Sequence, residues 1–420
     1  MTCRNSAIDS IEEGEKRMSE ALARNGETAV APGLSDFMPG GVLSPEPDSR
    51  VNLIGQDRDG LTALVAEMGE PAFRAKQLYH WIYMRGAKNF ADMTNLSKAF
   101  RAKLEEKFRL DRPRISAHQK SVDGTQKWLL RYEDGNEAEM VFIPETDRGT
   151  LCISSQVGCS LTCAFCHTGT QMLVRNLTPG DIAGQVMLAR DELDDWAQTE
   201  EAGRKVTNIV LMGMGEPLYN TDNVMAAMRL VSDGDGIAIG RRKITLSTSG
   251  VVPDIQRVGE ELGLSLAISL HAVRDDLRDK IVPINRKYPI AQLMETVKGY
   301  PGLTTSRRVT WEYVMLKGVN DSDEDARTLL RLMEGIPSKV NLIPFNPWPG
   351  SEYECSDPAR VESFLAILHR AGMVATIRKT RGQDILAACG QLKSESQRIG
   401  KRERDRLASI RAEKEAAVGL

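Results

Sequence analysis

The stretch G-C-S-L-T-C-A-F-C-H-T-G, residues 158–169, decides how the rest of this 420-residue sequence is interpreted. It holds three of the seven cysteines, Cys159, Cys163 and Cys166. Three thiols so close together in a chain of intracellular character indicate a metal or cluster site rather than disulfides. Their spacing lets three sulfurs surround one centre and leaves that centre one protein ligand short, which is typical of a catalytic metal site.

The composition is that of an ordinary globular protein, with 41% hydrophobic residues, 27% charged residues and a formal net charge of −3. With this net charge, any surface for nucleic acid must be a local basic patch. No apolar run reaches the roughly 18 residues that a membrane span needs, and the N-terminus lacks the hydrophobic segment of a secretory signal. We therefore expect a cytoplasmic protein without a membrane association, in which thiols stay reduced.

The chain is expected to begin with a disordered extension over residues 1–50, which is rich in Gly, Pro, Ser and Glu. Residues 51–125 predict a small helical accessory domain, because apolar residues recur there at helical spacing. Its many cations form either a solvated helix face or a patch that contacts RNA. They are Arg74, Lys76, Arg85, Lys88, Lys98, Arg101, Lys103, Lys107, Arg109, Arg112 and Arg114.

Residues 126–148 predict a β-hairpin that links this domain to the main one. From 149 to 393, strand-like and helix-like segments alternate, which indicates a parallel sheet. The expected strands are 150–155, 206–212, 243–247, 265–270, 309–316 and 340–345. The expected helices begin at Thr178 and continue at 223–231, 254–262, 291–298, 323–333 and 359–370. Residues 394–420 predict a charged helical tail.

Six strand–helix units favour an open, partial α/β barrel, with functional residues at the carboxyl ends of the strands. Polar residues follow the apolar strands at these ends. Each alone is an ordinary turn or capping residue, but together they indicate ligand contacts. The glycines allow a ligand to approach the backbone, and the glutamate can take an ammonium group. The candidates are Gly215, Glu216, Ser247, Ser269, Leu270, His271 and Asn346.

The cysteine stretch has three interpretations. Zinc could be held by the three cysteines and His167, although adjacent residues such as Cys166 and His167 rarely turn toward the same ion. Covalent haem matches C-A-F-C-H at 163–167, although that attachment normally occurs outside the cytoplasm. The third interpretation is an iron–sulfur cluster with one free iron.

The C-x₃-C-x₂-C motif at the start of a partial barrel resembles the radical S-adenosylmethionine (SAM) superfamily. This resemblance implies a [4Fe–4S] cluster held by Cys159, Cys163 and Cys166, with SAM on the fourth iron. Two longer runs, T-L-C-I-S-S-Q-V-G-C at 150–159 and T-I-R-K-T-R-G-Q-D-I-L-A-A-C-G-Q-L at 376–392, resemble one branch, the dual-specificity RNA methyltransferases of the RlmN type. The resemblance covers roughly residues 70–395 and implies a partial (βα)₆ TIM-like barrel with a helical N-terminal domain.

That family methylates carbon 2 of one adenine in 23S rRNA and of the adenine next to the anticodon in tRNAs. The resemblance implies that one SAM methylates Cys389 and that a second SAM supplies a 5′-deoxyadenosyl radical, which activates this methyl group. The carbon then joins the RNA base, Glu139 takes the proton from carbon 2, and Cys152 attacks the sulfur of Cys389. A transient disulfide results, and a reductant such as flavodoxin must reopen it. We expect a monomer.

Two other functions stay open at this point. A paralogue that methylates carbon 8 of adenine shares the cluster motif and both thiols. A zinc-containing RNA-binding module without catalysis would use the same cysteines.

Overall fold

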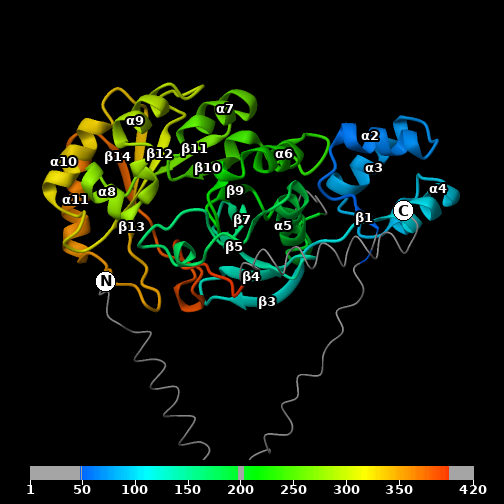
Figure 1. Ribbon diagram of the computed structural model, residues 1–420, viewed down its shortest axis with the longest axis horizontal. Coiled ribbons are helices and arrows are strands. Elements are labelled where there is room, and N and C mark those ends of the chain that lie inside the picture. Colours follow the sequence, from blue (N-terminus) through cyan, green and yellow to red (C-terminus); the bar gives the residue numbers. More distant parts are fainter. Residues whose placement is uncertain (1–47, 49, 197–202, 397–420) are drawn as a thin grey trace, which may run out of the picture. The chain divides into compact units, whose positions relative to one another are not determined.

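The computed structural model describes residue 48, residues 50–196 and residues 203–396. The expected N-terminal extension and the charged tail fall almost entirely outside these ranges. Most of the described chain is built around one ten-stranded sheet, in the order β14-β13-β12-β11-β10-β9-β6-β5-β4-β3. The seven strands from β14 to β6 pair in parallel, and β5, β4 and β3 continue the sheet as an antiparallel meander. Two edges remain, so the sheet is an open barrel (Figure 1).

The parallel strands are short and largely apolar, and the central ones are buried or half-buried on both faces, whereas the edge strand β14 and Lys339 on β13 have exposed positions. The parallel strands are β6 Gly149–Cys152, β9 Asn208–Leu211, β10 Ile244–Thr248, β11 Ser265–Ser269, β12 Val309–Met315, β13 Ser338–Pro344 and β14 Val374–Ile377. The antiparallel strands are β3 Arg114–Lys120, β4 Gln126–Arg131 and β5 Glu137–Pro144. Near the cysteines, β7 Gln156–Val157 pairs with β8 Arg175–Asn176.

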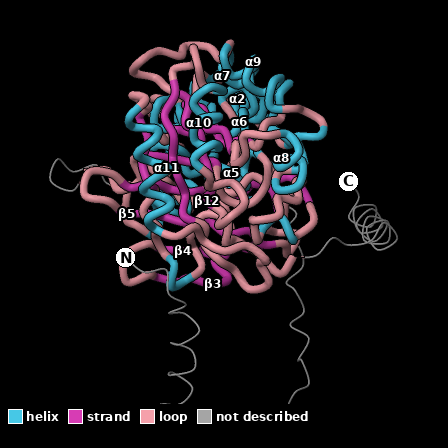
Figure 2. The backbone as a smooth tube through the Cα atoms, turned by 90° about the vertical axis from the view of Figure 1, so that its left-hand side faces the viewer, coloured by secondary structure: helices cyan, strands magenta, loops and turns pink. Residues whose placement is uncertain are grey.

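Helices form a layer outside the strands, in which α5, α6, α7 and α9 contact one another in succession. Figure 2 shows α10 and α11 side by side, with β12 behind them. Thr178 caps α5 with a capping box, as its sequence predicts. The helices are α5 Pro179–Glu192, α6 Thr221–Ser232, α7 Val252–Leu262, α8 Asp275–Ile281, α9 Ile290–Lys298, α10 Asp323–Leu332 and α11 Pro358–Arg370. Short helical turns are η4 Thr168–Thr170, η5 Pro217–Tyr219, η6 Arg241–Lys243, η7 Pro283–Arg286 and η8 Gln383–Ile385.

The fold class and the alternation of strands and helices are confirmed. The structure adds helix α8 and strands β3 and β14, which the sequence did not predict, as well as the two-residue strands β1, β2, β7 and β8. Strand β3 lies within residues 51–125, which were expected to be helical, and every residue of it is exposed. With no buried face, this strand has no apolar alternation that would reveal it.

The helical N-terminal region consists of α2 Arg58–Glu67, α3 Phe73–Tyr79, the π-turn η2 His80–Met84, η3 Phe90–Asp92 and α4 Lys98–Lys107. A two-stranded parallel sheet, β1 Val51–Asn52 with β2 Phe108–Arg109, closes it. Ion pairs join it to the barrel. Arg58 Nη2 lies 2.7 Å from Asp233 Oδ1, and Arg112 Nε lies 2.9 Å from Asp191 Oδ2.

The cations of this region differ in exposure, and two of them, Arg74 and Arg101, are half-buried. Arg109 and Arg112 are structural: their side chains are 9% and 6% exposed and ion-paired, so they cannot belong to an open RNA-binding patch. A second group lies exposed on the surface and keeps that interpretation available. It comprises Lys76, Arg85, Lys88, Lys98, Lys103, Lys107 and Arg114, of which Lys88 and Lys103 also form ion pairs.

Candidate active site

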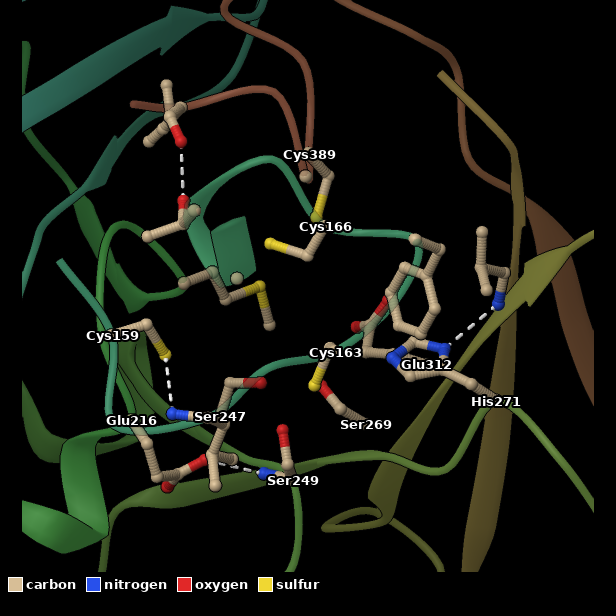
Figure 3. Close-up of a pocket in the computed structure, with 18 of the residues that line it drawn as sticks. Cys159, Cys163, Cys166, Glu216, Ser247, Ser249, Ser269, His271, Glu312 and Cys389 are labelled. Carbon is tan, nitrogen blue, oxygen red and sulfur yellow. Dashed lines mark hydrogen bonds between the residues drawn. The ribbon is translucent and has the colours of Figure 1, made fainter. Parts of the chain in front are cut away.

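One cavity opens at the carboxyl ends of the parallel strands, where barrel folds place their sites. Cys159, Cys163 and Cys166 all line it. Figure 3 shows their sulfurs on different sides of one common space. Burial raises the pKa of all three thiols, to about 12 for Cys159. A positively charged iron centre would reverse this effect by binding them as thiolates.

His167 does not join these cysteines. Its ring stacks on Trp348 with the centroids 4.8 Å apart, and its Nδ1 lies 3.3 Å from the carbonyl oxygen of Gln391. The side chain is absent from the cavity lining. The structure therefore offers three thiols without the histidine that a Cys₃His zinc site requires.

Glu216 and Gly215 form the floor of the cavity on the loop after β9. The Glu216 carboxylate is buried and accepts the backbone N–H groups of Leu218, at 3.1 Å, and Ser249, at 2.8 Å. Burial raises the pKa of this carboxyl. Gly215 has φ +100°, and a Cβ there would lie 2.5 Å from the Cβ of Gln156. Glycine at this position therefore keeps the loop close to the cysteine stretch.

Most of the other strand-end residues also reach the cavity. Ser247, Ser269, His271 and Asn346 line it, whereas Leu270 is fully buried and does not. His271 has φ +60° and accepts the Val314 N–H at Nδ1, which places its own proton on Nε2. Burial lowers its pKa to about 3, so the ring is neutral.

Glu312, on β12, is a cavity residue that the sequence analysis missed. It is 3% exposed, and its Oε1 accepts from Asn341 Nδ2 at 3.0 Å. Its Oε2 is buried without a hydrogen-bond donor in the described chain and lies 3.8 Å from Arg378 Nη1. A buried carboxylate oxygen of this kind needs a donor, which a polar ligand in the cavity would supply. The signal in the sequence was a lone acid within the apolar run 309–316.

Cys389 lies on the segment after β14 and lines the same cavity, next to Cys166 (Figure 3). Hydrogen bonds attach this segment to the cysteine stretch. The His167 N–H donates to the Gly390 carbonyl at 2.7 Å, and Thr168 Oγ1 donates to the Leu392 carbonyl at 2.5 Å. From the loop after β13, Asn346 Nδ2 donates to the Cys389 carbonyl at 3.3 Å.

Cys389 also lines a second, smaller cavity, which Cys152 at the end of β6 lines as well. Arg378 lines both cavities as well, and its guanidinium lowers the pKa of both thiols. Burial still dominates and raises the pKa of Cys152 to about 12. Both cysteines are free thiols in this structure.

Glu139, like Leu270, is a predicted residue that lines neither cavity. It lies on β5, 6% exposed, on the same face of the sheet as Val141, which is directly opposite Cys152. Lys127 Nζ lies 3.0 Å from its Oε1, and the Lys393 N–H donates to its Oε2 at 2.8 Å. Burial raises the pKa of this carboxyl, and Lys127 opposes the rise.

The donor set fits an iron–sulfur cluster with an open position. Three thiols line the cavity, the neighbouring histidine is turned away, and an unsatisfied carboxylate oxygen faces the remaining space. In residues 48, 50–196 and 203–396, no three Cys, His, Asp or Glu side chains are already grouped tightly enough to hold a metal. Three thiols around one wide space suit a multinuclear cluster, whose irons each bind a different sulfur, better than a single metal ion.

Comparisons with known proteins agree with this geometry. The model of the radical SAM superfamily matches residues 153–330, and that of the ribosomal RNA large subunit methyltransferase N-terminal domain matches residues 51–110. A protein of Bradyrhizobium sp. (strain BTAi1) named dual-specificity RNA methyltransferase RlmN is 58% identical over 376 residues, covering 87% of this chain and 93% of the relative. A protein of Rhodospirillum rubrum with the same name is 60% identical over 84% of this chain and 83% of the relative. The chain belongs to the RlmN family.

A solved structure supports the family assignment. The crystal structure of a radical SAM methyltransferase from Sphaerobacter thermophilus is 43% identical, with a TM-score of 0.76 over 82% of this chain and 100% of that one. The chain is therefore a radical SAM methyltransferase, and its cofactors are a [4Fe–4S] cluster and SAM. In the part of the RlmN-family chain that the structure describes, no helix is long and apolar enough to cross a membrane.

Proposed function

We propose that this protein methylates carbon 2 of an adenine in 23S rRNA, and of the adenine next to the anticodon in tRNAs, through a methyl group carried by Cys389. One observation carries the assignment of roles. Cys389 lines both cavities, so it has the three cluster cysteines on one side and Cys152 on the other. A carrier thiol in this position serves a radical step and a thiol-exchange step without a large movement.

The cluster residues in this proposal are Cys159, Cys163 and Cys166, and the contacts for SAM come from the strand ends. When bound, cluster and SAM together supply the methyl group and the 5′-deoxyadenosyl radical that activates it. Glu216 is placed for an ammonium group, because its buried carboxylate lies among hydrogen-bond donors on the floor of the cavity. Neutral His271 can donate from Nε2 but cannot repel a sulfonium cation.

Cys152 acts after the carbon has joined the RNA. It attacks the sulfur of Cys389, the bond from that sulfur to the RNA-linked carbon breaks, and its electron pair leaves with the carbon, which a proton then completes to a methyl group. Because the pKa of Cys152 is about 12, only a small fraction is thiolate near neutral pH. Arg378, which lines both cavities, favours the thiolate form.

Three further roles belong to the same proposal. The exposed cations of residues 51–125 contact RNA phosphates, a reductant such as flavodoxin reopens the disulfide, and the enzyme works as a monomer in the cytoplasm. The family-model match over residues 51–110 supports a role of this region in the methyltransferase. The boundaries 51–125, 126–148, 149–393 and 394–420 stay predictions.

Cys152→Ala tests the central claim, because it removes the thiol that releases the product. We expect purified Cys152→Ala protein to carry covalently bound RNA, whereas a control variant, Cys355→Ala, should carry none. Cys355 lies outside both cavity linings and makes an isolated bridge with Leu316. Cys152→Ala protein free of RNA would refute the proposed role of Cys152.

The position of methylation is tested with RNA that carries deuterium at carbon 2 or carbon 8 of the target adenine. Mass spectrometry of the product nucleoside should show loss of the label at carbon 2. Loss of the label from carbon 8 would overturn the proposed specificity. Anaerobically purified protein with zinc in place of iron and sulfide would exclude the reaction altogether.

A further inference from the structure

Lys127 lies deep in the sheet next to the proposed general base. It is on β4, and its side chain is only 10% exposed. Leu129, two residues along β4, is directly opposite Glu139 on β5, so Lys127 and Glu139 are diagonal neighbours on one face of the sheet. Their Nζ–Oε1 distance is 3.0 Å. A buried ammonium beside a buried carboxylate is costly unless each charge compensates the other.

Lys127 also contacts the segment that carries Cys389. Its Nζ lies 3.3 Å from the carbonyl oxygen of Leu386. Leu386 has φ +50°, a left-handed conformation that a leucine adopts only when its surroundings hold it there. The other carboxylate oxygen of Glu139 accepts the N–H of Lys393 at 2.8 Å. Lys127 and Glu139 together therefore hold the chain on both sides of Cys389.

We propose that Lys127 is a positioning residue, which keeps Glu139 ionised and fixes it against the Cys389 segment for the step in which the RNA adduct loses its proton. This inference rests on the proposed function. In that step the carbon 2–hydrogen bond of the adduct breaks, its electron pair stays on the adduct, and the proton passes to Glu139 and then to water. The one unpaired electron that the radical addition leaves on the adduct would return to the oxidised cluster when that cofactor is bound. Lys127 keeps its charge throughout and stabilises the carboxylate before and after the transfer.

The need for Lys127 follows from the surroundings of Glu139. Burial favours the protonated acid, which cannot accept a proton, and Lys127 is the charged side chain that opposes this effect. The titratable groups that interact with Lys127 from other elements are Glu139 on β5 and His167 in the cysteine stretch, and the charges of Lys393 and Glu395 also act on His167. Neither the Lys393 N–H nor the Ser154 hydroxyl, which donates to the Glu139 carbonyl at 2.6 Å, supplies a compensating charge.

The test compares Lys127→Met, Lys127→Arg and a control, Lys298→Met, at the exposed end of α9. Each reconstituted full-length enzyme is assayed for methylation of Cys389 without RNA, for covalent RNA adduct, and for release of methylated RNA across a pH series. For Lys127→Met we expect normal methylation of Cys389, adduct accumulation, and release slowed by about 10²-fold, the lower end of the usual general-base contribution. Its pH profile should shift to higher pH, because an unpaired Glu139 needs a higher pH to ionise.

Lys127→Arg should restore most of the rate and the original pH profile, because it keeps the charge, and Lys298→Met should match the wild type. Two results would overturn the inference. One is release by Lys127→Met at the wild-type rate and with the wild-type pH profile. The other is an equal loss of Cys389 methylation and RNA release, which would mean a merely structural role. Failure of the proposed function is distinguishable, because the wild type itself would then form no methylated RNA.

Discussion

Arg112 is one of the N-terminal cations that the sequence analysis considered as RNA contacts. The structure buries its side chain, so its loss should affect stability. Its Nε lies 2.9 Å from Asp191 Oδ2, and the two side chains are 6% and 2% exposed. Its Nη groups donate to the carbonyls of Gly86, Ala87 and Leu110 at 2.7 to 2.9 Å. This one side chain therefore joins the helical region to α5 of the barrel.

The cost of Arg112→Met follows from these contacts. Removal of one partner of a buried ion pair typically costs about 3–5 kcal/mol, because the other charge stays buried and unpaired. Three carbonyls also lose a charged donor, each such bond being worth about 1.5–3 kcal/mol. Asp191 keeps two other partners, Lys88 Nζ at 3.3 Å and Trp196 Nε1 at 2.6 Å, which limits the loss. We expect destabilisation by about 3–5 kcal/mol, the range for the ion pair alone.

Urea unfolding, followed by tryptophan fluorescence and by circular dichroism, measures this difference. The control is Lys107→Met on the exposed surface of α4, which should stay within about 0.5 kcal/mol of the wild type. If Lys107 contacts an RNA phosphate, Lys107→Met should reduce the slope of log binding constant against log salt concentration by about one. A loss of unfolding free energy below about 1 kcal/mol in Arg112→Met would refute the structural role of Arg112, because removal of a buried ion-pair partner is among the mutations with large effects on stability.

Three further predictions concern the cavities. Gly215→Ala should lower the melting temperature and weaken SAM binding in equilibrium dialysis, because φ +100° disfavours alanine and the alanine Cβ would meet Gln156. An unchanged melting temperature and SAM affinity would contradict this prediction. The rate at which iodoacetamide alkylates Cys152, measured by mass spectrometry, should rise steadily from pH 7 to pH 10. The reason is that only the thiolate reacts and the pKa of Cys152 is about 12. A rate that levels off near pH 8 would contradict that pKa. Cys163→Ala protein, purified without oxygen, should lose its iron and sulfide by elemental analysis, whereas Cys355→Ala should retain both.

Much of the barrel could be predicted because most parallel strands are short apolar runs that alternate with helical segments, two of which carry a capping box. Strand β10 at Ile244–Thr248 and helix α5 with its Thr178 cap are examples. Helix α8 was missed because its seven residues are mostly charged, and β14 because four residues give too little periodicity. The edge strand β3 carries no buried face at all.

Some residues of the candidate site could also be predicted from the sequence, and others could not. Residues at the ends of apolar strands, such as Ser247 and His271, were predictable from the barrel rule. The proximity of Cys389 to Cys166 follows from tertiary contacts between distant segments, and only a resemblance to known sequences could indicate it. The partnership of Lys127 and Glu139 depends on the register of β4 and β5, which a one-residue shift would destroy.

The hydrogen bonds between the cysteine stretch and the segment after Cys389 join parts of the chain that are more than 200 residues apart. During synthesis the cysteines leave the ribosome long before their partners do. A nascent chain can complete its helical region and most of the sheet while the cavity still lacks one wall, because Gly390, Leu392 and Ser394 are among the last described residues to be made. A product truncated before residue 389 would thus keep the ten-stranded sheet, yet it would have neither the methyl carrier nor the wall that shields the cluster.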